Sequence, residues 1–149
     1  MRIVFVTSRF PYPVEKGDKL RAFHQIRMLS AHHEIHLVAI SHNDIAPEHL
    51  DAMAPYCKTI KVFPIHKWLI PFQLVLGWIE GLPLQVSYFL DRPIKRTVQY
   101  HIIHLEPDHV ICQLIRASTY VRALPFPKTL DYMDVFSEGM LQLAKKYHP

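Results

Sequence analysis

Residues 3–24 of this chain read IVFVTSRFPYPVEKGDKLRAFH, and they indicate its fold. The apolar run Ile3–Val6 predicts a buried strand, and the prolines that follow predict a stiff loop. Asp18 is a good N-cap residue, since its carboxylate can accept hydrogen bonds from the free backbone N–H groups of a first helical turn. We therefore expect a strand, a loop and a helix, in that order.

Three cations surround the predicted start of this helix. Cations are mildly unfavourable there, by roughly 0.3–1 kcal/mol each, because the helix dipole makes the N-terminus positive. A bound anion such as a phosphate would turn the cluster into a binding site. The alternative is a solvated helix start. Gly17 has a structural alternative of its own, a positive φ that serves the turn of the same loop. The candidate phosphate-binding residues are Lys16, Gly17, Asp18, Lys19 and Arg21.

The rest of the chain alternates apolar strands with helices. The predicted strands cover residues 2–7, 34–41, 59–65, 109–113 and 129–133, and the predicted helices cover residues 18–31, 47–55, 91–105 and 138–147. Short apolar strands separated by helices are typical of a parallel sheet covered on both faces. We therefore expect the α/β class, with a doubly wound, Rossmann-like parallel sheet in a single domain over residues 1–149.

Ligands of such sheets bind beyond the carboxyl ends of the strands. Three segments that carry polar residues fall there, at residues 16–21, 113–120 and 131–137. Outside the helix start, the candidates for contact with a ligand are His24, Arg116, Asp134 and Ser137. Each has a structural alternative: His24 can pack against the domain without contacting a ligand, Arg116 can be an ordinary surface residue, and Ser137 can be the N-cap of a helix.

Composition limits the class of protein. The chain has 149 residues, about one domain with a real core, and its formal net charge of +4 suits an anionic partner or a membrane surface. Nucleic-acid binding would require a denser basic stripe with interleaved aromatic residues, so no nucleic acid is expected. Cys57 and Cys112 make no disulfide framework, and the apolar run after Met1 is too short for a signal peptide. A cytoplasmic protein is expected.

The motifs of several enzyme classes are absent from the sequence. Its four glycines form neither G-x-G-x-x-G nor a phosphate loop, so no dinucleotide cofactor is expected. The spacing of the eleven histidines matches no metal-ligand pattern, so no metal is expected. The sequence has no nucleophile elbow and no pair of carboxylates with the arrangement of a general acid and base, so no catalytic residue is predicted.

The segment Trp68–Ile79, WLIPFQLVLGWI, is apolar nearly all round, with only Gln73 breaking the pattern. Its twelve residues fall short of the ~20 needed to cross a bilayer, and Pro71 interrupts it. The domain core, another protein surface or the membrane interface must therefore cover it. A homodimer through this segment is one expectation, and a peripheral contact with the inner face of a membrane is another.

Four segments in collinear order resemble the group 1 glycosyltransferases of family 4, closest to the bacterial sugar transferases of exopolysaccharide-type systems. The first is SRFPYP with KGDKLR, residues 8–13 and 16–21, and the second is PLQVSYF, residues 83–89, which matches the family's usual passage from a helix to a strand. The third is QLIR with the later Tyr-Val pair, residues 113–121, and the fourth is LDYMDVFS, residues 130–137. The resemblance spans essentially the whole chain.

The resemblance implies the N-terminal half of a GT-B enzyme, which has two facing Rossmann-like domains. In that family the N-terminal domain binds mainly the acceptor, a glycan or a lipid-linked sugar. The C-terminal domain binds the nucleotide-sugar donor and carries a Glu-x₇-Glu motif. This chain ends at Pro149, before such a domain, so we expect sugar transfer, with retention and without a metal, only from a longer protein. The alternative is a stand-alone, non-catalytic module that binds an anion or a carbohydrate.

Overall fold

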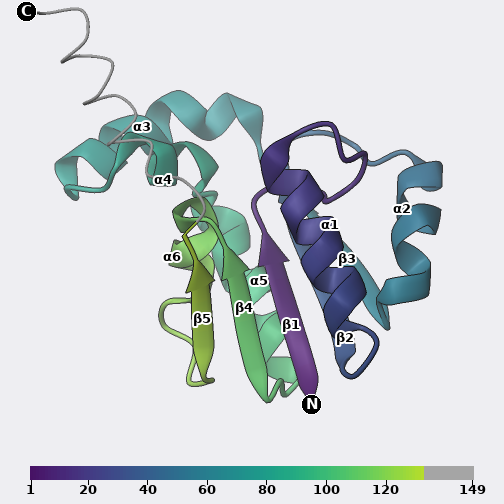
Figure 1. The fold of residues 1–149 in the computed structure, drawn as a ribbon. Coiled ribbons are helices and arrows are strands. Elements are labelled where there is room, and N and C mark those ends of the chain that lie inside the picture. The colour runs from purple at the N-terminus through teal and green to yellow at the C-terminus, as the bar shows by residue number, and fades with distance from the viewer. Residues whose placement is uncertain (133–149) are drawn as a thin grey trace, which may run out of the picture.

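The computed structural model describes residues 1–132 of the chain. In that part, five strands form one sheet: β1 (Arg2–Thr7), β2 (Glu34–Ser41), β3 (Thr59–Pro64), β4 (His109–Gln113) and β5 (Lys128–Asp131). Their spatial order is β3-β2-β1-β4-β5, and every adjacent pair is parallel (Figure 1). The predicted α/β class with a Rossmann-like parallel sheet is therefore confirmed.

Helices connect the strands and cover both faces of the sheet. They are α1 (Gly17–Leu29), α2 (Pro47–Met53), α3 (Ile70–Ile79), α4 (Leu84–Phe89), α5 (Arg92–His104) and α6 (Ser118–Val121), with 3-10 turns at Ala54–Tyr56, Lys67–Leu69 and Ile115–Ala117. In Figure 1, α1 lies in front of the sheet and α5 behind it. The fifth strand ends two residues earlier than predicted, and the helix predicted over residues 138–147 lies outside the described residues.

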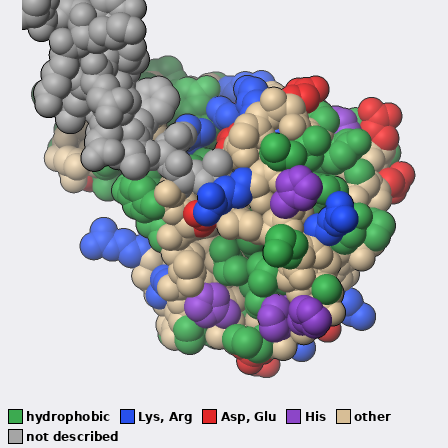
Figure 2. Space-filling view, in the orientation of Figure 1, with side chains coloured by type: hydrophobic (Ala, Val, Ile, Leu, Met, Phe, Trp, Pro, Cys, Tyr) green, Lys and Arg blue, Asp and Glu red, His purple; other side chains and the backbone are tan. Residues whose placement is uncertain are grey.

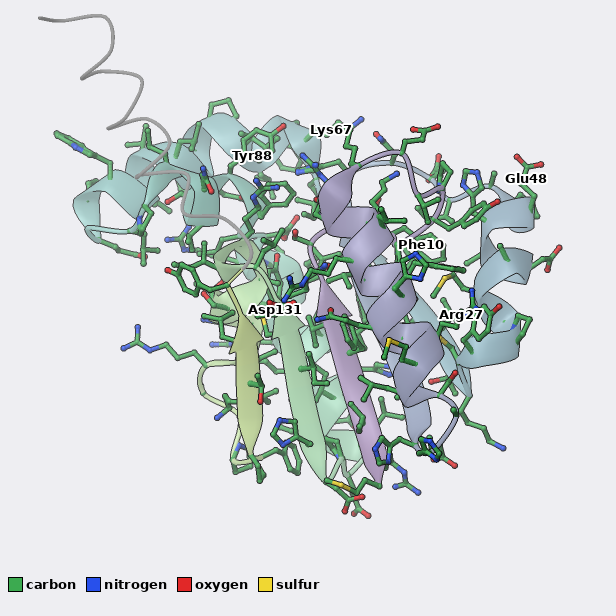
Figure 3. All side chains as sticks on the ribbon, in the orientation of Figure 1. Phe10, Arg27, Glu48, Lys67, Tyr88 and Asp131 are labelled. Atoms are coloured by element: carbon green, nitrogen blue, oxygen red, sulfur yellow. The ribbon has the colours of Figure 1, made fainter. Side chains whose placement is uncertain are left out.

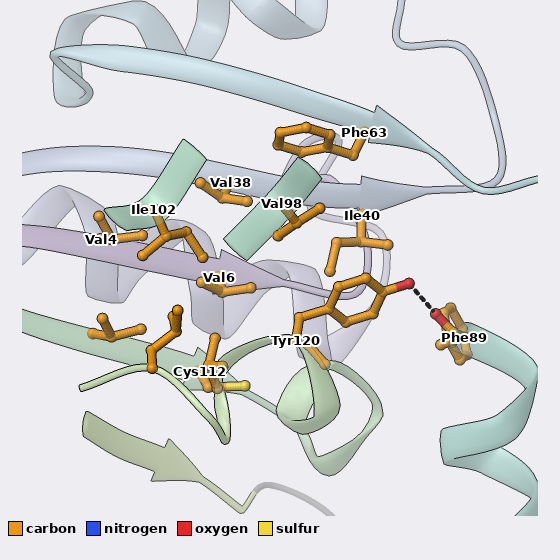
Figure 4. Packing of buried hydrophobic residues seen from close by; sticks show 14 of the residues in the cluster. Val4, Val6, Val38, Ile40, Phe63, Phe89, Val98, Ile102, Cys112 and Tyr120 are labelled. Atoms are coloured by element: carbon orange, nitrogen blue, oxygen red, sulfur yellow. Dashed lines mark hydrogen bonds between the residues drawn. The ribbon is translucent and has the colours of Figure 1, made fainter. Parts of the chain in front are cut away.

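Alternate residues of β1 pack on opposite faces of the sheet, as the two-residue period of a strand requires. Ile3 and Phe5 belong to a core that includes residues of α1 and α2. Val4 and Val6 belong to a second core that includes residues of α5 and α6 (Figure 4). Because both faces of β1 are buried, the strand is apolar throughout its centre, which is the pattern of a buried parallel strand.

Asp91 fixes the start of α5. Its buried carboxylate accepts hydrogen bonds from the backbone nitrogen of Ile94 at 3.2 Å, and from the backbone nitrogen and Nδ1 of His66 at 2.9 and 2.8 Å. The Asp91 backbone N–H donates to the Tyr120 hydroxyl, which in turn donates to the backbone oxygen of Phe89, each at 2.8 Å (Figure 4). This network ties α4, α5, α6 and the segment that follows β3 together.

Helices α3 and α4 form a hairpin beyond the carboxyl ends of the strands (Figure 1). Their packing is close: a Cβ on Gly77 of α3 would overlap the side chain of Ser87 in α4. The helix-to-strand passage that the resemblance implies for residues 83–89 is wrong, because Leu84–Phe89 are helical and lead into α5.

Burial along α3 is the reverse of what its composition suggests. Gln73, the one polar residue of the apolar segment, is 2% exposed, whereas Trp68 and Trp78 are 76% and 77% exposed. The expectation that the domain core covers this segment is therefore wrong for the two tryptophans, and the protein and membrane options stay predictions. Among residues 1–132, no helix has the length and apolar character needed to cross a membrane.

Candidate anion-binding site

The loops after the strands meet at the carboxyl edge of the sheet, where the strand order reverses between β1 and β4. The Gln113 side chain at the end of β4 donates a hydrogen bond of 2.6 Å to the backbone oxygen of Asp18 in α1. The Arg21 guanidinium of α1 binds Asp131 at the end of β5. The predicted convergence of these three segments at one edge of the sheet is confirmed for their described residues.

Helix α1 begins one residue before Asp18. Lys16 is its N-cap and makes no side-chain capping bond, so the prediction that Asp18 is the N-cap is wrong. Asp18 lies in the first turn, where a carboxylate is favourable to the helix dipole. Its Oδ2 accepts a hydrogen bond of 3.2 Å from Arg9 Nη1, which closes the loop between β1 and α1.

A cavity of about 420 Å³ lies beside this loop. Its walls come from four places: the loop after β1, the start of α1, the loop after β2 with α2, and the α4 region with the turn before α3. The lining residues are Ser8, Arg9, Phe10, Tyr12, Pro13, Lys16, Lys19, Ser41, His42, Asn43, Asp44, Ile45, His49, Lys67, Tyr88 and Phe89. In Figure 3, Lys67 and Tyr88 both lie above the carboxyl ends of the strands. We call this cavity the carboxyl-edge pocket.

The carboxyl-edge pocket is cationic. Four lining side chains, Arg9, Lys16, Lys19 and Lys67, carry positive charge, and one lining carboxylate, Asp44, opposes them. Arg9 is paired with Asp18, and Lys67 donates a hydrogen bond of 2.9 Å to the Asn43 side chain. Within the described part of the chain, Lys16 and Lys19 have no carboxylate partner. In Figure 2, several Lys and Arg side chains lie on the upper part of the visible face, and others lie at its centre and on its flanks.

His42 forms part of the pocket wall. Its ring lies 5.1 Å from the Tyr88 ring and 5.2 Å from the Phe89 ring, measured between centroids. Both ring nitrogens are buried and have no hydrogen-bond partner among the described residues. Burial lowers the pKa of His42, and the positive charges of Lys67 and Arg9 lower it further. The ring is therefore held neutral near pH 7, and an anion in the pocket would favour its protonation.

Arg21 lies outside the carboxyl-edge pocket. Its Nε and Nη2 donate to the two carboxylate oxygens of Asp131, each at 2.9 Å, and the Gln25 side chain donates to the same carboxylate at 2.8 Å. Figure 3 shows Asp131 at the upper end of β5. Arg21 lines a second hollow, against β4 and β5, where its charge is already neutralised.

Gly17 and His24 also lie apart from the pocket lining. A positive φ is absent at Gly17 and, among the described glycines, occurs at Gly81, so the expectation that Gly17 supplies a left-handed turn is wrong. A Cβ on Gly17 would have nothing within 4 Å. His24 is exposed, and its ring meets the edge of the Phe23 ring with centroids 5.6 Å apart.

Arg116 lies behind the pocket wall. Its guanidinium carbon is 5.4 Å from the centroid of the Phe89 ring, a cation–π contact with a residue that lines the pocket. The predicted candidates Asp134 and Ser137 lie outside the described residues.

Two of the four lining cations, Arg9 and Lys67, were not predicted from the sequence, and neither was His42. Each of the three follows the carboxyl end of a strand, at β1, β3 and β2 respectively. The signal that could have identified them is position: in a parallel sheet, the first residues after every strand meet at one edge.

The described residues offer no preformed metal centre. Among residues 1–132, no group of three or more His, Cys, Asp or Glu side chains is placed to hold a metal ion. Cys57 and Cys112 are free, and burial raises the pKa of each thiol to about 12. A thiolate is the form that binds metals and attacks substrates, so neither cysteine is suited to that chemistry.

No family model and no curated protein matches this sequence.

Proposed function

We propose that this chain is the acceptor-binding half of a glycosyltransferase that moves a sugar from a nucleotide-sugar donor to a glycan or lipid-linked acceptor. The observation that carries the proposal is the carboxyl-edge pocket, whose cations include Lys16 and Lys19 from the segment that resembles the family. The Rossmann-like order of the sheet supports it as well, because such sheets bind ligands at this edge.

In this proposal the pocket holds a phosphate of the acceptor or of the donor. Lys16 and Lys19 supply charge-assisted hydrogen bonds, and the backbone N–H groups at the start of α1 add the positive end of the helix dipole. Tyr12, Tyr88 and Phe89 provide aromatic walls on which the apolar face of a sugar ring can rest. The described residues position a ligand, and the second half of the enzyme supplies the donor and the chemistry.

The proposal is tested by calorimetric titration of the chain with inorganic phosphate, pyrophosphate and nucleoside diphosphates. We expect binding that weakens with salt, because exposed charges are screened over about 10 Å at 0.1 M salt. The double variant Lys16→Ala with Lys19→Ala should weaken binding at least about tenfold, since a charge-assisted hydrogen bond contributes roughly 1.5–3 kcal/mol where water is partly excluded.

Arg27→Ala with Lys58→Ala is the matched control, because both side chains are exposed and neither lines the pocket. An equal loss of affinity in both double variants would show a general charge effect and would contradict the site. The reading frame beyond codon 149 separates the two functions. A second Rossmann-like half with a Glu-x₇-Glu motif supports the transferase, and a stop codon supports the stand-alone binding module.

A further inference from the structure

Five large apolar side chains are exposed together on α3 and the turn before it. They are Trp68, Phe72, Val75, Trp78 and Ile79, each more than half exposed, and we call them the α3 surface. Positions 68, 72, 75 and 79 are three or four residues apart, so they form one stripe along the helix. Isolated exposed apolar residues are ordinary, but a contiguous patch marks an interaction site.

The stripe faces outward because the opposite side of α3 is packed against α4. Gln73 and Gly77, one turn apart, are both buried, and Gly77 is packed against Ser87 of α4. Rotation of α3 to bury the stripe would place larger side chains where only glycine fits. The close α3–α4 packing therefore presents the apolar stripe to the outside.

Cations flank the α3 surface at both ends. Lys67 precedes Trp68 at the N-terminal end. At the other end, Arg92 Nη2 lies 2.7 Å from Glu80 Oε2, so the carboxylate at the end of α3 is neutralised. Arg92 also lines a groove with Lys95 and Arg96 on the first turns of α5. Lys67 thus lies at the N-terminal end of the stripe, and beyond its C-terminal end Arg92, Lys95 and Arg96 outnumber the single carboxylate of Glu80. We call these four cations the cationic rim.

We propose that the α3 surface docks on an anionic lipid bilayer, with α3 lying in the plane of the interface. Ten residues of helix span about 15 Å, too short to cross the apolar core of a membrane but suited to lie at its boundary. Trp68 and Trp78 bring two indole rings to the level of the headgroups, where tryptophan is favoured. The cationic rim matches the negative surface potential of anionic lipids.

The charge of the rim argues against a second copy of the chain as the occupant. A two-fold dimer would place the same patch on itself and bring cations toward cations. An anionic bilayer turns the same charges into attraction. This docking does not depend on which ligand the carboxyl-edge pocket binds.

The test uses vesicles of phosphatidylcholine and phosphatidylglycerol in equal parts, with vesicles of phosphatidylcholine alone as the comparison. Both tryptophans of the chain belong to the α3 surface, so intrinsic fluorescence reports its environment without a label. We expect the tryptophan emission to shift to shorter wavelength and the protein to float with the anionic vesicles. Binding to the neutral vesicles should be at least about tenfold weaker.

Two double variants, each with its own control, separate the apolar contribution to binding from the charged one. The first variant tests the apolar contribution. Phe72→Ser with Val75→Ser keeps both tryptophans and should abolish the wavelength shift. The control Met28→Ser with Tyr100→Ser removes equally exposed apolar side chains on α1 and α5 and should leave the shift unchanged. Circular dichroism verifies that each variant is folded.

Lys95→Gln with Arg96→Gln should weaken binding to anionic vesicles by about tenfold or more. Arg27→Gln with Lys58→Gln is its control, with two exposed cations outside the rim. The proposal is overturned if the chain ignores anionic vesicles, if it binds neutral ones equally well, or if test and control variants lose binding alike. A wavelength shift that grows with protein concentration without vesicles would assign the surface to a second copy instead.

Discussion

The side chain of Tyr120 in α6 joins the end of α4 to the start of α5 through two hydrogen bonds. Its fully buried hydroxyl accepts from the Asp91 N–H and donates to the Phe89 carbonyl oxygen. Tyr120→Phe leaves two buried backbone groups without that partner, which should lower the free energy of unfolding by about 1–3 kcal/mol. Urea denaturation measures the change. Tyr100→Phe, at an exposed tyrosine, is the control and should change stability little.

Two histidines make the stability of the fold depend on pH. The pKa values of His42 and His101 are lowered from 6.5, mainly by burial, with Lys61 the next cause for His101. The unfolded chain therefore binds more protons than the folded one once pH falls below about 6.5. We expect the free energy of unfolding to fall from there through the lowered pKa values. Urea denaturation across this range measures it.

His101→Gln should reduce this pH dependence, whereas His32→Gln, at an exposed histidine, should not. Glu34, whose pKa is lowered by hydrogen bonds from His36 and Arg2, acts in a different range, below its ordinary value of 4.5. A stability that stays constant or rises between pH 6.5 and pH 4.5 would contradict the lowered histidine pKa values.

At the scale of elements, the α3–α4 hairpin depends on Gly77. A Cβ there would overlap both Ser87 Oγ and Ser87 Cβ, so a change of the Ser87 rotamer cannot remove the whole conflict. Gly77→Ala should therefore separate the two helices and destabilise the protein by about 1–3 kcal/mol, the usual range for overpacking. Thermal unfolding measures the effect, with limited proteolysis across residues 79–84 as a local readout.

Gly17→Ala is the matched control for Gly77→Ala. The Cβ at Gly17 meets nothing within 4 Å, and alanine is the better helix former, so this variant should be neutral or more stable. Equal destabilisation by both substitutions would mean that glycine flexibility, not the contact with Ser87, sets the cost.

The elements that the sequence predicts best are the strands that consist of a continuous apolar run. The apolar runs of β1, β2 and β4 predict buried strands because both faces of each strand are covered. Helix α3 could not be predicted in the same way. The apolar composition of α3 indicates that part of its surface is covered by another surface. Which face of the helix is buried in this domain depends on the contact between Gly77 and Ser87, which are ten residues apart.

At the start of α1, the sequence likewise predicts the local pattern of the candidate site but not the contacts made with distant segments. The spacing of Lys16 and Lys19 correctly indicates two cations at a helix N-terminus, and the structure places both on the pocket lining. Arg21, two residues further along, faces β5 because Asp131 offers it a bidentate partner. Such a pairing across 110 positions of sequence has no local signal.

At the scale of the whole molecule, the carboxyl-edge pocket is a product of sheet topology. Its lining comes from segments near residues 9, 19, 42, 67 and 88, which the parallel strands bring to one edge. The α3–α4 hairpin stands at the same edge, and Lys67 and Tyr88 belong to the pocket wall (Figure 1). The proposed ligand site and the proposed membrane-facing surface are therefore neighbours.

The central claim is that this pocket binds a phosphate-bearing ligand, and amide chemical-shift mapping during titration with pyrophosphate tests it most directly. We expect saturable shifts at residues 9–19 and 42–45, with little change along the Arg92–Gln99 groove, which is also basic but lies elsewhere. Shifts confined to that groove, or spread evenly over exposed lysines and arginines, would contradict the claim.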